Sequence, residues 1–309
     1  MTTAGHPQPP VAVERFSVMG THAEVQVIDG PLELIVEARA RLDALEERWS
    51  RFRPSSDVSR LNAASGAWVP VARETLLLLD RAVTGARATD GRFDPTIGAA
   101  LVAHGYDRTF AEVADRSVEL VPEPVVDGSW PMIELDHGAG AALLPEGTWF
   151  DPGGIGKGLA ADLVCSELAE RAGGLLVNVG GDLRMRGTAP DPAGWVVRVD
   201  DPFDRERELT RLAIPEGGVA TSSNQHRRWH TAEGAAHHII DPRTGRPAES
   251  EVVAVTVVAA EAWWAEVQAT SLFIAGPEGL DEVDATAEVA IVTADGEVHA
   301  TRGFSAVLT

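Results

Sequence analysis

The sequence predicts an α+β protein in which mixed, largely antiparallel sheets pack against helices. Stretches that alternate apolar and polar residues stand next to each other, without an intervening helix, near both ends of the chain. Such neighbouring stretches are typical of hairpins. The helical patterns between them do not alternate one for one with strands, which argues against a doubly wound parallel sheet.

The first half of the chain contains one strand pair and two helices. Residues 11–18 (VAVERFSV) and 21–29 (THAEVQVID) alternate apolar and polar side chains, which predicts an N-terminal strand pair. Pro31 opens a helix. The apolar face of this helix, at steps of three and four, comprises Ile35, Ala38, Leu42, Leu45, Trp49 and Phe52. A second helix fits residues 74–89, and residues 105–147, rich in Pro, Asp and Gly, predict loops and short strands.

The second half contains strands of two kinds. A helical pattern runs through Arg171, and LLVNV (175–179) reads as a short buried strand. VVAVTVVAA (252–260) is continuously apolar, which predicts a strand covered on both faces. A helix follows over about 262–275. The chain ends in a hairpin, whose Asp295-Gly296 pair favours a type I′ turn.

The formal net charge of −21 limits the partners of this protein. Nucleic acids and anionic membranes reward positive charge, so neither is expected as the main partner. A phosphorylated ligand would be repelled by the average field of the chain. Any site for one must therefore supply local cations, from a metal ion, a lysine or backbone N–H groups.

Cys165 is the only cysteine, which excludes an internal disulfide and a thiolate metal cluster and favours a reducing cytoplasm. No apolar run reaches the roughly 18 residues that a membrane-spanning helix needs. Residues 1–14 lack the charge and hydropathy pattern of a signal peptide and are expected to form a flexible lead-in. Residues 15–309 are expected to form one domain.

Residues 150–164 (FDPGGIGKGLAADLV) place glycines and a lysine before a helical pattern. The loop is not a Walker A motif, because Asp151 and Gly158 stand where that motif has a glycine and a metal-binding hydroxyl. It is not a dinucleotide fingerprint either, since Leu159 stands at the third glycine position. A helix N-terminus with Lys157 could still hold phosphate groups. Ordinary tight-turn glycines explain the segment equally well.

Two further segments contain candidate site residues. Glu266 and Thr270 are four residues apart on a predicted helix and share one face. A carboxylate and a hydroxyl are hard oxygen ligands suited to magnesium, although a solvated Glu and a core-facing Thr would give the same spacing. HHIIDPRTG (237–245) sets two histidines before a short apolar run and a turn. These histidines are either catalytic or structural.

Taken together and in this order, the segments resemble the ApbE family of FAD:protein FMN transferases. The matching blocks are MGT (19–21), FRPSSDVSRLN (52–62), GRFDPTIGAAL (91–101), DPGGIGKGLAAD (151–162), LVNVGGDLRMRG (176–187), ATSS (220–223), HHIIDPRTG (237–245) and VTVVAAEAWWAEVQATSLFIAG (255–276). The resemblance implies an ApbE-like flavin transferase fold over residues 15–309. It also implies magnesium-dependent transfer of FMN from FAD to a Ser or Thr hydroxyl of a target protein, with release of AMP. Some family members instead hydrolyse FAD to FMN and AMP.

The resemblance also implies roles for individual residues. The magnesium ion would take the backbone carbonyl of Gly154 and the side chains of Glu266 and Thr270. His238 would act as general base. The residues expected to line the FAD site are Met19, Asn62, Phe93, Asp94, Asp151, Lys157, Asp182, Thr221, Ser222 and Ile240.

This sequence departs from the family pattern at several of these blocks. Glu266 stands where the family usually has Asp, and the longer side chain changes the expected metal geometry. Ser223 replaces a common glycine, and NQHRRW (224–229) replaces the usual acidic-aromatic stretch. Three functions therefore stay open besides a chance match by a structural protein: FMN transfer to protein, FAD hydrolysis, and FAD binding without catalysis.

Overall fold

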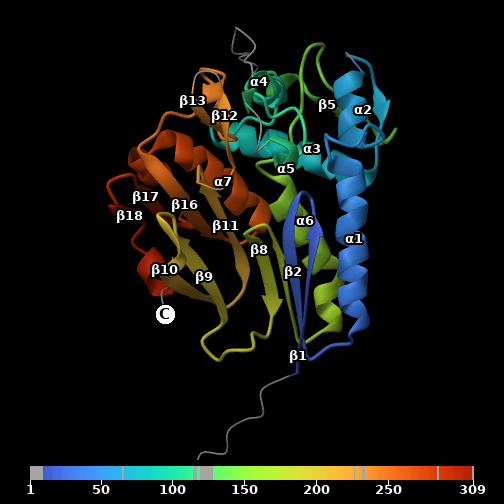
Figure 1. Ribbon diagram of the computed structural model, residues 1–309. Helices are drawn as coiled ribbons and strands as arrows, with labels where there is room; N and C mark the ends of the chain where they lie inside the picture. Colours follow the sequence, from blue (N-terminus) through green and yellow to red (C-terminus); the bar gives the residue numbers. More distant parts are fainter. Residues whose placement is uncertain are drawn as a thin grey trace, which may run out of the picture.

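The centre of the structure is an eight-stranded antiparallel sheet (Figure 1). The computed structural model describes residues 10–64, 66–113, 117–118, 128–225, 227–231, 234–283 and 285–307. In spatial order, the strands of the central sheet are β1 (Val11–Val18), β2 (Thr21–Ile28), β7 (Gly174–Val179), β8 (Asp182–Gly187), β11 (Gly217–Ser223), β16 (Val252–Ala259), β17 (Glu288–Thr293) and β18 (Val298–Ala300).

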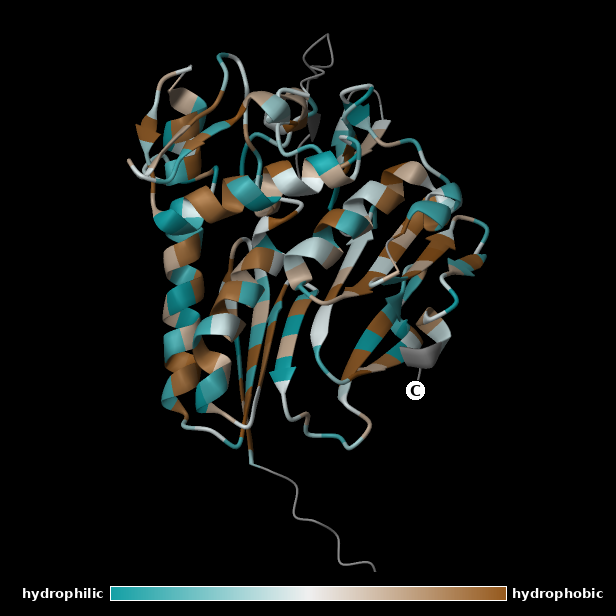
Figure 2. Cartoon of the chain, turned by 180° about the vertical axis from the view of Figure 1, so that it is seen from behind, coloured by the Kyte–Doolittle hydropathy of each residue, from teal (hydrophilic) through white to brown (hydrophobic). Residues whose placement is uncertain are grey.

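Helices cover one face of this sheet, and a two-stranded sheet covers part of the other (Figures 1 and 2). The main helices are α1 (Glu33–Trp49), α3 (Arg73–Ala88), α6 (Gly156–Leu168) and α7 (Ala262–Ala275), and the outer pair is β9 (Trp195–Asp201) with β10 (Asp204–Ile214). Successive side chains of β7 point to opposite faces of the sheet, so this strand packs against both layers. Leu175 and Val177 pack with the α1 and α6 side chains, whereas Leu176 packs with β9 and β10.

Shorter elements gather beyond one end of the central sheet (Figure 1). Three small sheets have the strand orders β3-β6-β5, β13-β12-β4 and β14-β15. The strands and helices of this region are α2 (Asp57–Ala63), β3 (Val69–Pro70), α4 (Gly98–Ala103), α5 (Phe110–Val113), β4 (Ser117–Val118), β5 (Glu134–Asp136), β6 (Ala141–Leu143), β12 (Arg228–Thr231), β13 (Gly234–His237), β14 (Ile240–Asp241) and β15 (Arg246–Pro247). The β12–β4 pairing is parallel, and all the other strand pairs are antiparallel among the residues described. The predicted α+β class with largely antiparallel sheets is confirmed.

Most predicted elements have the expected type. β1 and β2 form the N-terminal hairpin, and every residue of β16 is buried, as its continuous apolar run predicts. α1 starts two residues after Pro31. The helix predicted through Arg171 ends at Leu168 and continues as one 3-10 turn. Because β1 begins at Val11 and pairs with β2 from its first residue, the boundary of the lead-in at residue 14 is four residues too late; residues 1–9 lie outside the described residues.

The predicted type I′ turn at Asp295-Gly296 is wrong. Such a turn needs positive φ at both central residues, and Asp295 is not among the non-glycine residues with positive φ in the described chain. Thr293 and Glu297 instead close a three-residue loop, in which Gly296 N–H donates to the Thr293 carbonyl at 2.9 Å. A type I turn followed by a left-handed glycine has this arrangement. The aspartate carboxylate stabilises the loop by accepting from the Thr293 hydroxyl at 2.6 Å.

The turn between β1 and β2 does have positive φ at both central residues, with values of 52° at Met19 and 67° at Gly20. This is the backbone of a type I′ turn, which matches the right-handed twist of the flanking strands. A non-glycine residue in this region is uncommon. The sheet pairing therefore holds Met19 in an unusual conformation at the tip of the hairpin.

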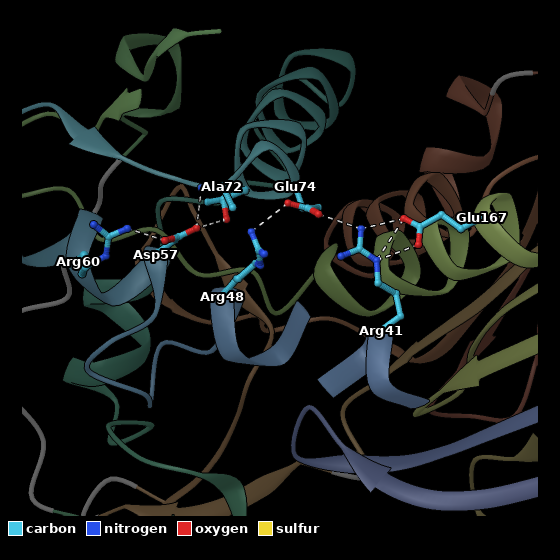
Figure 3. A network of polar contacts seen from close by, with 8 residues as sticks. Arg41, Arg48, Asp57, Arg60, Ala72, Glu74 and Glu167 are labelled. Atoms are coloured by element: carbon cyan, nitrogen blue, oxygen red, sulfur yellow. Dashed lines mark hydrogen bonds and ion pairs between the residues drawn. The ribbon is translucent and has the colours of Figure 1, made fainter. Parts of the chain in front are cut away.

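Ion pairs tie the helical layer together (Figure 3). The Arg41 guanidinium, on α1, lies 2.9 Å from a Glu74 carboxylate oxygen on α3 and 2.8 Å from Glu167 on α6. Arg48, two turns further along α1, lies 3.1 Å from the other oxygen of Glu74. Because these pairs are partly exposed, they fix the relative placement of the helices more than they add stability.

Asp57 caps the N-terminus of α3 from a different helix (Figure 3). Its carboxylate accepts from the Ala72 N–H at 2.9 Å and from the Thr75 hydroxyl at 2.7 Å, and it pairs with Arg60 at 2.5 Å. Burial opposes the charge, but the hydrogen bonds from Ala72 and Thr75 and the Arg60 charge outweigh it. The pKa of Asp57 is therefore below its ordinary value. α3 has no capping side chain of its own.

None of the helices in the described ranges is long and apolar enough to cross a membrane.

We expect Asp57→Asn to lower the free energy of unfolding by about 1–3 kcal/mol at pH 7, because the amide replaces a charged acceptor with a neutral one. A lowered folded-state pKa stabilises the protein above the ordinary carboxyl pKa, and this stabilisation is lost as the pH falls through the folded value. The difference from wild type should therefore shrink in acid. Urea unfolding at pH 7 and in an acid series measures it, with Asp43→Asn on the exposed face of α1 as control. A difference that is absent at pH 7, or that grows in acid, would contradict the assignment.

Candidate active site

One cavity of about 1060 Å³ collects almost all the predicted site residues. It lies where the β1–β2 turn, the glycine loop before α6, the buried face of α7 and the chain from β11 to β14 meet. The predicted residues that line it are Met19, Phe93, Asp94, Asp151, Gly154, Lys157, Asp182, Thr221, Ser222, His238, Ile240, Glu266 and Thr270. Its volume is at the upper end of the range usual for ligand sites.

A close crossing of α6 and α7 fixes the floor of this cavity. A Cβ atom on Gly158 would lie 2.5 Å from the Ala262 carbonyl oxygen, so only glycine lets the two backbones approach this closely. Asp162 of α6 accepts from the Ala262 and Trp263 N–H groups at 3.0 and 2.8 Å. It thereby caps α7, whose own N-cap residue, Glu261, makes no side-chain capping bond. The Gly158 N–H in turn donates to Glu266 at 2.9 Å.

Lys157, Asp182 and Glu266 form a buried charge cluster at this crossing. The Lys157 ammonium contacts the Asp182 carboxylate and lies 2.5 Å from Glu266. Burial acts to lower the pKa of Lys157, but the two carboxylates outweigh it and raise the pKa. Burial raises the pKa of Glu266 to about 8, and the Asp182 charge adds to this rise. One ammonium balances one of the two buried carboxylates, so the ionised form of Glu266 would need a further cation.

The residues around Glu266 have the donor chemistry of a hard-cation site. The Thr270 hydroxyl lies one helical turn from Glu266, 3.5 Å from the position a Cβ would take on Gly154 and 3.3 Å from the Ser222 hydroxyl. Carboxylate, hydroxyl and carbonyl oxygens suit magnesium, and a divalent ion would stabilise the ionised form of Glu266. Within the described ranges, no group of three or more His, Cys, Asp or Glu side chains is arranged to hold a metal. A metal here would therefore need backbone, hydroxyl and water ligands.

The glycine loop is held in place by Asp151. Its carboxylate accepts from the Gly153 N–H at 2.7 Å and pairs with the Arg51 guanidinium at 2.5 Å. Arg51 is itself buried, donates to the Tyr106 carbonyl at 2.7 Å and stacks over the Phe52 ring. The Asp151 carboxylate therefore stabilises the conformation of the loop, and its effect on a ligand would be indirect, through the loop.

The two adjacent histidines have different environments. His237 is buried with both ring nitrogens paired, to the Ala248 carbonyl at 3.1 Å and to the Ile239 N–H at 3.3 Å. His238 lines the cavity, and its Nδ1 is one of two buried side-chain polar atoms without a hydrogen-bond partner in the described structure. Burial holds the pKa of His238 well below 6.5, so its ring is neutral at pH 7. Of the two, His238 is therefore the one with a ring nitrogen free to accept a proton in the cavity.

Asn62 is the one predicted site residue that does not line the cavity. Its amide pairs with the backbone of Phe150 in both directions, donating at 2.9 Å and accepting at 2.8 Å. Phe150 directly precedes the glycine loop. Asn62 therefore positions the backbone just before the loop, and its contact with a ligand stays a prediction.

The remaining predicted residues differ in how firmly they are held. Asp94 is buried and accepts from both the Thr96 N–H and the Thr96 hydroxyl, at 2.7 and 2.5 Å. Thr221 is more exposed and contacts the Thr256 hydroxyl at 3.0 Å. The Phe93 ring packs against the glycine loop, with Cε2 3.0 Å from the Cβ position of Gly154. Ile240 and Met19 lie at different parts of the cavity wall.

None of the arginines that line the cavity was predicted as a site residue, and two of them stand beside predicted ones. Arg51 precedes the FRPSSDVSRLN block by one residue, and nothing in its sequence neighbourhood indicates a buried pair with Asp151. Arg227 lies in the NQHRRW stretch, where the sequence departs from the family pattern. This departure from the family pattern is the sequence feature that could have identified Arg227 as a site residue.

The comparisons with known proteins agree with this geometry. The model of the ApbE family matches residues 19–293. An FAD:protein FMN transferase of Salmonella typhimurium is 30% identical over 87% of this chain and 77% of its own length. One from Vibrio cholerae is 26% identical over 84% of this chain and 80% of its own. The crystal structure of the ApbE protein of Thermotoga maritima has a TM-score of 0.87 at 26% identity, covering 97% of this chain and all of the other.

We expect Gly158→Ala to destabilise the protein by about 1–3 kcal/mol, because the added methyl group pushes α6 away from α7. Gly156→Ala, in the same helix, is the matched control. Its Cβ would meet only the Pro152 Cβ at 3.3 Å and a Trp49 ring atom at 4.0 Å. Urea unfolding of the two variants measures the difference. Equal stability of both variants would show that the crossing tolerates a side chain.

Proposed function

The chain belongs to the ApbE family, and we propose that it transfers the FMN half of FAD to a Ser or Thr hydroxyl of an acceptor protein, with AMP as the second product. The observation that carries this proposal is one cavity lined by Lys157, Glu266, Thr270 and His238, large enough for an extended nucleotide. The relatives are named for the same reaction.

The proposed reaction exchanges one ester partner of the FMN phosphorus for another. The acceptor hydroxyl oxygen forms a bond to that phosphorus, the bond to the bridging oxygen breaks, and its electron pair leaves with AMP. His238 takes the hydroxyl proton at Nδ1. A neutral ring with this nitrogen unpartnered in the described structure supports the role. Lys157 places positive charge beside the phosphates.

We propose magnesium as the cofactor, held by the Gly154 carbonyl, Glu266 and Thr270. When bound, the ion would neutralise charge on the diphosphate. The hard oxygen donors support this choice, as do the two buried carboxyl groups that share the single Lys157 ammonium. Glu266 uses one oxygen for Lys157 and one for Gly158, and each carboxylate oxygen retains a further lone pair for a metal.

We also propose that the reaction takes place in the cytoplasm. Cys165 is the only cysteine, it is buried, and burial raises the pKa of its thiol to about 12. Such a chain gains nothing from an oxidising compartment.

Incubation with FAD, magnesium and a Ser/Thr-bearing acceptor tests the reaction, with flavin fluorescence of the acceptor on a denaturing gel as the readout. Flavin that stays with the denatured acceptor supports transfer. Free FMN with AMP would indicate FAD hydrolysis, and unchanged bound FAD would indicate a binding protein. Either of the last two results would overturn the proposal.

His238→Ala is expected to lower the transfer rate by about 10²–10⁴-fold while FAD still binds, because it removes only the proton acceptor. His230→Ala, on the exposed side of β12, serves as control. Rates are measured with saturating FAD, and FAD affinity is measured separately by flavin fluorescence. A normal rate for His238→Ala would refute its role as base.

Removal of divalent ions with EDTA should abolish transfer, and added Mg²⁺ should restore it. The reason is that the cavity side chains neutralise only part of the negative charge of the diphosphate, and the ion neutralises the rest. Glu266→Ala should raise the Mg²⁺ concentration needed for half-maximal rate, whereas Glu266→Asp should keep a functional site. Undiminished transfer in EDTA would exclude the magnesium requirement. An unchanged Mg²⁺ requirement in Glu266→Ala would exclude Glu266 as a ligand.

A further inference from the structure

Six cationic side chains line the cavity, and five of them are already paired with carboxylates. The pairs are Arg51 with Asp151, Arg53 with Glu46, Arg92 with Glu282, Lys157 with Asp182 and Glu266, and Arg198 with Asp200. The sixth is Arg227. Within the part of the chain that the structure describes, its guanidinium has neither an ion pair nor a hydrogen bond.

Arg227 stands beside the groups that the proposed reaction uses. It lies between β11 and β12 and lines the same cavity as Lys157 and His238. Its charge acts against protonation of both, although the carboxylates still raise the pKa of Lys157 overall. Asp182 and Glu266 form their ion pairs with Lys157, and neither forms one with Arg227 in the described structure. The half-buried guanidinium therefore adds a free positive charge to the cavity.

An unpaired guanidinium is unusual among the described cations that line the cavity. The chain has 47 acidic and 26 basic side chains, so carboxylate partners are abundant. Withdrawing a charge from water without a partner is unfavourable, and a bound anion removes that cost. The planar fork of arginine matches two oxygens of a phosphate group. Because the net negative charge of the protein repels phosphate groups, a phosphate site in it needs a local cation of this kind.

We propose that Arg227 binds non-bridging phosphate oxygens of FAD and is a further binding residue for the diphosphate, next to Lys157. The inference rests on the proposed function, since it takes FAD as the ligand. It assigns a role to the stretch 224–229, in which this chain departs from the family pattern. It also explains how a strongly acidic protein accepts an anionic substrate.

The test compares FAD with riboflavin, which has the same ring system and no phosphate, as ligands of the full chain. Arg227→Ala should weaken FAD binding about 10- to 100-fold, the effect of one lost charge-assisted contact. Riboflavin binding should not change. Arg227→Lys should recover part of the loss, because it keeps the charge without the fork. Arg228→Ala removes an exposed neighbouring charge outside the cavity and should bind FAD as wild type does.

Salt provides a second readout. FAD affinity of the wild type should fall more steeply with ionic strength than that of Arg227→Ala, since one screened charge pair is missing in the variant. Unchanged FAD binding in Arg227→Ala, or an equal loss for riboflavin, would overturn the inference. A variant that binds FAD normally but needs more acceptor protein would also overturn it, because Arg227 would then bind an acceptor carboxylate.

Failure of the proposed function would look different. If the wild type binds FAD and transfers FMN normally, and Arg227→Ala binds FAD as tightly as the wild type, only the inference about Arg227 is wrong. If the wild type binds FAD but forms neither acceptor-bound flavin nor AMP, the transferase proposal is wrong and the arginine result still stands. If the wild type does not bind FAD, both are wrong.

Discussion

The close approach of α6 to α7 at Gly158 is the constraint on which the site depends. Because no side chain separates the two backbones there, the N-terminal turn of α6 lies directly against the buried face of α7. Glu266 can then accept from the Gly158 N–H while it contacts Lys157, and Asp162 can cap α7 from α6. The glycine loop and the late helix, more than 100 residues apart in the chain, thereby become one rigid unit.

This rigid unit brings like charges together. Asp182 and Glu266 are buried side by side with a single ammonium between them, an arrangement that costs stability unless further positive charge is bound. Active sites are where such costs are usually found, because the same field that is unfavourable in the free protein favours a cation. The proposed magnesium site and the proposed phosphate-binding residues, Lys157 and Arg227, thus share one cavity in a chain of net charge −21.

Around this centre the other elements act as supports. Asn62 fixes the backbone before the glycine loop, and Asp151 with Arg51 fixes the loop itself. Asp57 and Arg41 hold the helices that carry these residues. Asn62 and Arg51 are far in sequence from the loop that they help to hold. The precision of the site therefore comes from the packing of the whole helical layer onto the sheet.

The sequence by itself determined the features that depend on local pattern. Period-two alternation located β1 and β2, the unbroken apolar run identified β16 as buried on both faces, and ordered blocks identified the ApbE family and most cavity residues. Only the tertiary structure decided which partner each polar group has. It paired the Asn62 amide with the Phe150 backbone and distinguished His238 from the fully paired His237. It also left Arg227 without a carboxylate in the described chain. Partners of this kind come from distant segments, so no local pattern encodes them.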